Sequence, residues 1–221
     1  MSVPTFGELK NTADNTNAVR KVLEAVAFIG PQSTDLPALT DATSQLVQVP
    51  AGFIPVGLTS PDGFTFGGET NVEEVQAYGY AEPIRRDITT VTKTITFTAY
   101  ETWRMALRQL ITGMDLSAVT QDAASGEIHY DAPARPSDRR YAFLVIGRDG
   151  SGTSEHFLGK LYPNTSITQL PEEVWSATDP VQAPIELSAY VDDALGTACR
   201  DFYAGTGAKA LADDLGWTPS V

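Results

Sequence analysis

The chain has 221 residues, of which 15 are Lys or Arg and 28 are Asp or Glu, so its formal net charge is −13. An apolar share of 42% excludes wholesale disorder, and no apolar run approaches the roughly 18 residues of a membrane-spanning helix. One cysteine, Cys199, excludes an internal disulfide framework, and the first residues lack the basic segment and apolar run of a secretory signal. We therefore expect a soluble, non-exported chain with no membrane partner.

The acidic charge also limits the kinds of partner. Proteins that bind DNA tightly neutralise its phosphates with Lys and Arg. A small basic surplus occurs in residues 76–110, and it comes from Arg85, Arg86, Lys93, Arg104 and Arg108. The charge thus predicts that the protein does not hold DNA tightly, while DNA remains free to slide past it.

The first fifty residues differ from the rest. The apolar residues of 19–26 recur at helical spacing and predict a short helix that begins near residue 15 or 17. The stretch 25–31 suits equally well a strand that ends at its Gly-Pro pair, so helix and strand both stay open for residues 18–29. Residues 31–50 have only scattered apolar positions, which indicates a projecting loop or interaction arm. The helical spacing is that of Val19, Val22, Leu23 and Val26.

A β-rich body begins at Phe53. Residues 53–58 predict a strand, Ser60-Pro-Asp-Gly63 predicts a turn, and residues 72–80 predict another strand. In residues 90–100, threonines alternate with a second set of mostly apolar residues, which is the pattern of a half-exposed strand. That second set is Val91, Lys93, Ile95, Phe97 and Ala99, with Lys93 as the exception.

A helix is expected directly afterwards, at about residues 101–112, with Gly113 placed to end it. Its expected buried face is Trp103, Leu107, Leu110 and Ile111, and Thr98 and Glu101 stand at capping-box spacing. Three further strands are predicted, at residues 141–147, 157–162 and 185–191, with a flexible turn at 149–152 between the first two.

These elements together predict a mainly β fold with one or two helices, arranged as a β-sandwich or barrel with a helix packed on it. We expect three parts: an N-terminal arm and extended loop at 1–50, the β domain at 51–193, and a peripheral C-terminal segment at 194–221 that contains a possible short helix.

Residues that could carry catalysis or bind a metal are sparse. His129 has no Cys or second His at ligand spacing, so a surface histidine beside a turn is the better interpretation. His156 follows Ser154 and Glu155, but neighbours on a strand point to opposite faces and no serine lies in a G-x-S-x-G elbow. We predict no catalytic residues and no metal site.

Three other features suit ordinary structure better than chemistry. The segment Gly205-Thr-Gly-Ala-Lys209 lacks the spacing and the hydroxyl residue of a phosphate loop, so no cofactor is expected. Cys199 beside Arg200 shows no further sign of activation. The adjacent acidic residues diverge in direction and predict a solvated surface; these pairs are Glu73-Glu74, Asp192-Asp193 and Asp213-Asp214.

The run from Glu101 to Arg108 has two interpretations of equal weight. It suits a capped amphipathic helix whose arginines shield acidic neighbours. It also suits an interface helix, because Trp103 and the two arginines, Arg104 and Arg108, are residue types enriched at interaction hot spots.

Four stretches of this sequence resemble the major tail proteins, or tail-tube proteins, of long, non-contractile-tailed bacteriophages. The resemblance extends over about residues 18–113, and only the general strand layout is similar beyond them. One departure is Ala77-Tyr-Gly-Tyr80, where the family tends to have Trp and paired glycines. The similar stretches are Ala18–Pro31 with Leu36-Pro37, Pro55–Gly63, Val72–Gly79 and Phe97–Thr102.

The resemblance implies a structural subunit without catalytic activity that forms hexameric rings, which stack into a hollow tail through which genomic DNA passes. Its implied partners are further copies of itself and the tape-measure, tail-terminator and tail-tip proteins. Its implied location is the virion, after assembly in the host cytoplasm. We add the expectation that acidic and Thr or Ser side chains line the lumen, with Arg85 and Arg86 in contacts between subunits.

Two alternatives remain. A head–tail joining or tail-completion ring protein of the same fold would form a single ring and would not polymerise. A small hydrolase or carbohydrate-binding β-sandwich would present exposed aromatic residues, and the tryptophans are too scattered in the sequence to predict such a site. They are Trp103, Trp175 and Trp217.

Overall fold

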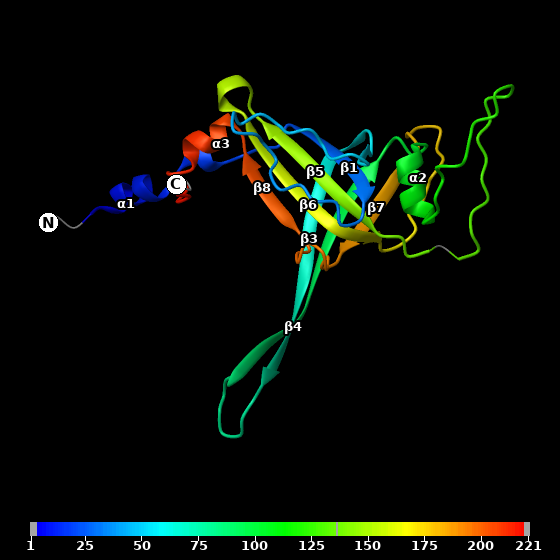
Figure 1. Ribbon diagram of the computed structural model, residues 1–221. Coiled ribbons are helices and arrows are strands. Elements are labelled where there is room, and N and C mark those ends of the chain that lie inside the picture. Colours follow the sequence, from blue (N-terminus) through cyan, green and yellow to red (C-terminus); the bar gives the residue numbers. More distant parts are fainter. Residues whose placement is uncertain (1–3, 136, 219–221) are drawn as a thin grey trace.

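The computed structural model describes residues 4–135 and 137–218 (Figure 1). The fold is mainly β, as predicted, with one antiparallel sheet of eight strands and three short helices. No helix in these residues is long and apolar enough to cross a membrane. The elements in chain order are α1 (Phe6–Ala13), β1 (Glu24–Pro31), β2 (Ile54–Pro55), β3 (Thr59–Val75), β4 (Arg85–Ala99), α2 (Met105–Thr112), β5 (Tyr141–Asp149), β6 (His156–Ile167), β7 (Ala183–Ala189), β8 (Arg200–Ala204) and α3 (Thr206–Leu211), with 3₁₀ turns at Thr16–Ala18 and Gly152–Ser154.

The strand order is β2-β1-β5-β6-β7-β4-β3, and β8 pairs with β6 beside β7. The sheet folds over on itself, because aromatic rings of strands that are distant in this order meet. Phe97 of β4 stacks on Phe143 of β5 at 5.3 Å between ring centroids, and Phe66 of β3 stacks on Tyr162 of β6 at 6.2 Å. The sheet therefore forms two layers, joined where β6 pairs with β7 over only three residues.

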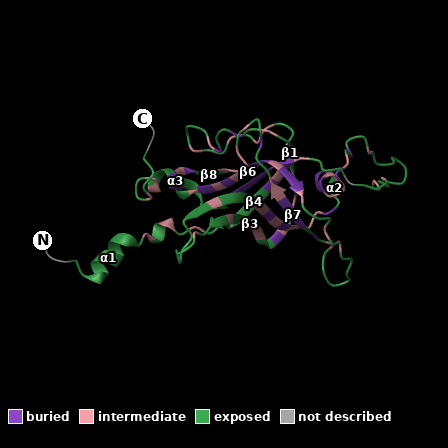
Figure 2. Ribbon diagram, turned by 90° about the horizontal axis from the view of Figure 1, so that it is seen from below, coloured by how far each residue is buried: buried purple, intermediate pink, exposed green. Residues whose placement is uncertain are grey.

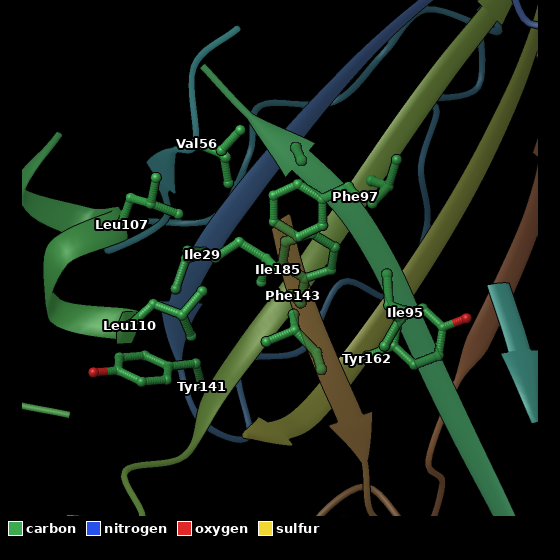
Figure 3. Close-up of a cluster of buried hydrophobic side chains, with 14 of the residues drawn as sticks. Ile29, Val56, Ile95, Phe97, Leu107, Leu110, Tyr141, Phe143, Tyr162 and Ile185 are labelled. Carbon is green, nitrogen blue, oxygen red and sulfur yellow. The ribbon is translucent and has the colours of Figure 1, made fainter. Parts of the chain in front are cut away.

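The main core lies between the two layers and under α2 (Figure 3). Ile95, Phe97 and Ala99 alternate into it from β4, as the period-two pattern predicts, and Leu107 and Leu110 close it from the helix. Gly113 ends α2 with a φ of +66°, the left-handed conformation that glycine adopts at low cost. The helix begins later than predicted, at Met105, and Trp103 is 71% exposed, so it does not belong to the buried face.

A second core lies on the opposite face of β5 and β6 and is covered by residues 36–53. Leu144 and Leu161 point to this side, and Leu36 and Leu39 lie against them with only 4% and 2% of their surface exposed. The expectation that 31–50 projects is therefore wrong. Leu36 and Leu39, with Val47, Val49 and Phe53, pack this segment, which we call the strap, against the body.

The open question at residues 18–29 is resolved as a strand from Glu24 onward. β1 lies between β2 and β5 and pairs with β5 along its whole length. The predicted helix there is wrong because the sheet takes up these backbone groups and buries Ala27 and Ile29 on one face. The helix lies earlier, at α1, where Thr5 and Glu8 form a capping box that signals it in the sequence.

Three more local predictions are corrected. Ser60–Gly63 is an irregularity inside β3 and does not reverse the chain. Residues 53–58 contain only the two-residue β2. The C-terminal part is not all peripheral, since β8 pairs with β6 and Phe202 packs against the second core.

We predict that Leu39→Ala lowers the free energy of unfolding by about 2–5 kcal/mol, because the substitution opens a cavity under the strap. Chemical denaturation monitored by tryptophan fluorescence measures this. Leu46→Ala is the matched control on the same segment, and it should cost much less because Leu46 is 44% exposed. Equal small losses for both variants would show that the strap does not contribute to the core.

Candidate assembly surfaces

The side chains considered for chemistry do not come together in space. His129 is exposed, and its Nδ1 lies 3.7 Å from Oε1 of Glu127. In the described residues, 4–135 and 137–218, there is no group of three or more His, Cys, Asp or Glu able to hold a metal ion. Gly205-Thr-Gly-Ala-Lys209 opens α3, and the Gly207 N–H donates to the carbonyl oxygen of Glu155 at 2.8 Å, so this N–H is already taken up within the chain.

The acidic pairs and the cysteine also lie apart. Asp192 is buried and accepts the backbone N–H groups of Ala194 and Leu195 and the hydroxyl of Ser33, whereas Asp193 is exposed. Glu73-Glu74 lies on the outer part of β3, and Asp213-Asp214 follows α3. Cys199 is half-buried and burial raises the pKa of its thiol, which disfavours the reactive thiolate.

His156 is a packed core histidine. Its Nδ1 lies 3.0 Å from the hydroxyl oxygen of Tyr203 on β8, and a Cβ at Gly207 would stand 2.3 Å from its Nε2. The ring thus joins β6, β8 and α3. Burial lowers the pKa of His156 below its ordinary value of 6.5; nearby Arg20 adds to this and Asp149 opposes it.

A prominent uncovered feature is the outer part of the β3–β4 hairpin (Figure 1). β4 pairs with β7 only from Lys93 to Ala99, whereas it pairs with β3 as far out as Arg85. Residues 68–92 therefore form a two-stranded ribbon that projects from the body, and almost all of them are exposed (Figure 2). An isolated two-stranded hairpin is at best marginally stable in water.

The ribbon has large apolar side chains exposed along it. Tyr78 is fully exposed and Tyr80 is 70% exposed at its tip. Arg85 and Arg86 also lie here, each paired locally, with Asp87 at 2.7 Å and with Glu74 at 3.9 Å. The remaining exposed apolar residues of the ribbon and its loop are Val75, Ile84, Ile88 and Val91.

The sheet face opposite the main core is polar over β3, β4 and β7. Cross-strand register places Thr65 beside Thr96 and Thr96 beside Glu186, and it places Glu69 beside Thr92. We call this surface the threonine face. It contains no Lys or Arg at its inner positions, and a hollow of about 420 Å³ lies on it beside Asp62 and Glu172. Its inner positions are Thr65, Gly67, Glu69 and Asn71 on β3, Thr90, Thr92, Thr94, Thr96 and Thr98 on β4, and Pro184, Glu186 and Ser188 on β7.

A further group of side chains lies at α2. The sequence analysis pointed to Trp103 and Arg108, but not to their partners Glu173 and Trp175, because Arg108 and Glu173 are 65 residues apart. The guanidinium of Arg108 lies 5.2 Å from the ring centroid of Trp103 and donates to Glu173 at 2.9 Å. Trp175 donates its Nε1–H to the other oxygen of Glu173 at 2.8 Å. The helix from Met105 packs into the core, but its N-cap residue Arg104 makes no side-chain capping bond, so the capping box expected of Thr98 and Glu101 does not form. The role of this run as an interface stays a prediction.

Comparison with known proteins adds little at the level of sequence. No protein-family model matches the chain, and no curated protein matches it. Among solved structures, it is similar to a chain of the PVC sheath–tube complex, an extracellular contractile injection system seen by cryo-EM in the extended state. The two are 12% identical with a TM-score of 0.42, over 92% of this chain and 99% of the other. These values are too low to transfer any property from that complex to this chain.

We predict that His156 makes the protein less stable in acid. A histidine whose folded-state pKa is lowered binds its proton more readily when unfolded, so stability is full above pH 6.5 and falls as pH drops below that value. Urea unfolding at pH 8, 6 and 5 measures the slope. His156→Gln should flatten it, and His129→Gln, at the exposed histidine, should leave it unchanged. A wild-type slope retained in His156→Gln would contradict the assignment.

Proposed function

We propose that this protein is a structural, non-catalytic subunit of a phage-type tail tube, which assembles into hexameric rings that stack around a lumen for DNA. The observation that carries the proposal is the projecting β3–β4 ribbon with its uncovered strands. A second copy that packs on the ribbon would bury its apolar side chains and pair its open edges.

The open edges of the sheet support the same proposal. β3 is the last strand of the sheet order and pairs only with β4 along its 17 residues. β2 ends the order on the other side, with only two residues. Pairing of β3 with a neighbouring copy would continue the sheet from subunit to subunit, and a closed ring of copies removes exposed edges altogether.

We propose that the threonine face lines the lumen. Hydroxyl groups and carboxylates such as Glu69 and Glu186 offer DNA no cation to bind, and the net charge of −13 repels a polyanion. Lys93 belongs to the opposite parity of β4. Arg85 and Arg86 lie farther out on the ribbon than Asn71 and Thr90, and each is paired with a carboxylate. No cofactor is needed for this role.

In this proposal the partners are other copies of the chain and, at the ends of the tube, the tape-measure, tail-terminator and tail-tip proteins, in a virion assembled in the host cytoplasm. A head–tail joining or tail-completion ring is the alternative, and it differs in stopping at a single ring. Negative-stain microscopy of the concentrated protein distinguishes long hollow tubes from isolated rings.

We predict that the ribbon is required for assembly and not for folding. Replacing residues 69–92 by Asn-Gly joins Gly68 to Lys93, which are cross-strand partners, through a two-residue hairpin turn. The variant should keep its free energy of unfolding within about 1 kcal/mol, because the removed side chains lie outside both cores. It should remain monomeric by sedimentation under conditions in which the wild type forms tubes. Tubes of normal length from this variant would refute the role of the ribbon.

We also predict that arginines on the threonine face make the tube retain DNA. Tubes of the double variant Thr92→Arg, Thr94→Arg should hold a 30-base-pair duplex during gel filtration, more weakly as salt rises. The control places the same two charges on the loop between α2 and β5, as Ala123→Arg and Ala124→Arg, both exposed positions. Equal retention by control tubes would show that the threonine face does not line the lumen.

A further inference from the structure

The N-terminal helix α1 is formed but unpartnered. Its capping box gives backbone N–H groups at the start of the helix their hydrogen-bond partners, and the Thr5 N–H donates to the carboxylate of Glu8 at 2.7 Å. Phe6, Leu9 and Ala13 share one face of the helix, because they are three and four residues apart. Phe6 is 82% exposed and Leu9 is 55% exposed, and no residue of α1 is buried. A helix of eight residues is marginal in water without tertiary packing, so its apolar face needs a partner.

An apolar groove lies at the end of the body where β3 and β4 depart as the ribbon. There the two layers of the sheet separate, and the inner face of β5 and β6 is left open. The opening, which we call the mouth groove, has a volume of about 760 Å³. Its apolar lining includes Leu23, Ala25, Phe64, Phe66, Val145 and Leu158.

Three carboxylates, Glu24, Asp62 and Asp201, line the mouth groove beside one lysine, Lys160. Asp201 pairs with Lys160, and Glu24 pairs with Arg148 at 2.7 Å. Asp62 accepts from the hydroxyl of Ser60 and forms no ion pair within the described residues. Lys10, which follows Leu9 on α1, carries the charge that would complement these carboxylates, and its own pairing with Asp14 is loose, at 3.9 Å with both side chains exposed.

The root of the arm is fixed so that α1 points away from the groove of its own chain. Arg20 pairs with Asp149 at 3.5 Å, the Lys21 N–H donates to the same carboxylate, and the Leu23 N–H donates to the carbonyl oxygen of Arg148. Asp149 ends β5, and from this point the chain runs outward past the α3 end of the body (Figures 1 and 2). Residues 14–19 and the helix together reach about 30 Å, enough to meet a neighbour.

We propose that α1 of one copy docks in the mouth groove of a second copy, with Phe6 and Leu9 inserted between the two layers and Lys10 against Asp62. This inference rests on the proposed function, since it identifies one contact of the assembly. In the free subunit the contacts of Arg20, Lys21 and Leu23 direct the arm outward, away from the groove of its own chain. Exchange between copies keeps them.

Disulfide trapping between two different variants tests the exchange. Both start from Cys199→Ser, so that each chain has one engineered cysteine. One variant carries Leu9→Cys and the other carries Ala25→Cys with a larger affinity tag, so that the mixed product has its own mobility on a non-reducing gel. Because each chain has a single thiol, the mixed product forms only between copies. Ala212→Cys, beside the hollow between α3 and β8, is the matched control for the second position.

The proposal expects a mixed Leu9–Ala25 product well above the Leu9–Ala212 product. Adding Phe6→Ala to the first variant should lower its yield on the order of tenfold or more, since a buried phenyl side chain is lost from the contact. Cross-linking no greater than the Ala212 control would overturn the proposal, and so would a yield unaffected by Phe6→Ala.

Microscopy of wild-type protein separates this inference from the proposed function. If tubes form but the Leu9–Ala25 product does not, arm exchange is refuted and the proposed tail-tube function still stands. The Leu9–Ala25 product without rings or tubes supports arm exchange and counts against the tail tube.

Discussion

A two-stranded ribbon in water has both faces and both outer edges solvated, so it gains little from burial or from hydrogen bonding beyond its own ladder. The outer part of β3 and β4 is such a ribbon, since its pairing continues to Arg85 while the support from β7 stops at Lys93. The rest of the account depends on this one constraint. The mouth groove lies where the ribbon leaves the body, the open edge of β3 runs along the ribbon, and the exposed tyrosines lie at its tip. Each of these is completed most simply by another copy of the chain.

Away from the mouth groove, the body that carries the ribbon is closely packed. β5 and β6 are buried on both faces, by the second layer and α2 on one side and by the strap on the other. This explains why Tyr141–Gly147 is a continuous apolar run, whereas β4 alternates: β4 buries one face only and leaves its threonines on the other. The same alternation that builds the core thus produces a surface without basic residues.

The sequence predicts those elements that depend on contacts between residues close together in the chain, and it misses those that depend on distant partners. Local periodicity predicts the strands β4, β5, β6 and β7 and the helix α2, and Gly113 marks the end of α2. The strap and β1 depend on distant partners: Leu36 and Leu39 are buried only because Leu144 and Leu161 lie above them, and Arg20 is held by Asp149 far along the chain. The group of side chains at α2 needs Glu173 to join two tryptophans, which no local pattern reveals. α1 is different, because the capping box of Thr5 and Glu8 is a local signal for it. The more regular apolar spacing at 19–26 favoured a helix there instead.

Hydrogen exchange of the backbone amides of residues 69–75 and 85–92, compared between the dilute subunit and the concentrated assembled protein, shows whether another copy completes the ribbon. The account predicts rapid exchange of these amides in the free subunit and strong protection on assembly, while the amides of β5 and β6 are protected in both states. If the ribbon amides exchange equally fast in both states, or are already as protected as β5 in the monomer, the ribbon is not the part of the molecule that another copy completes.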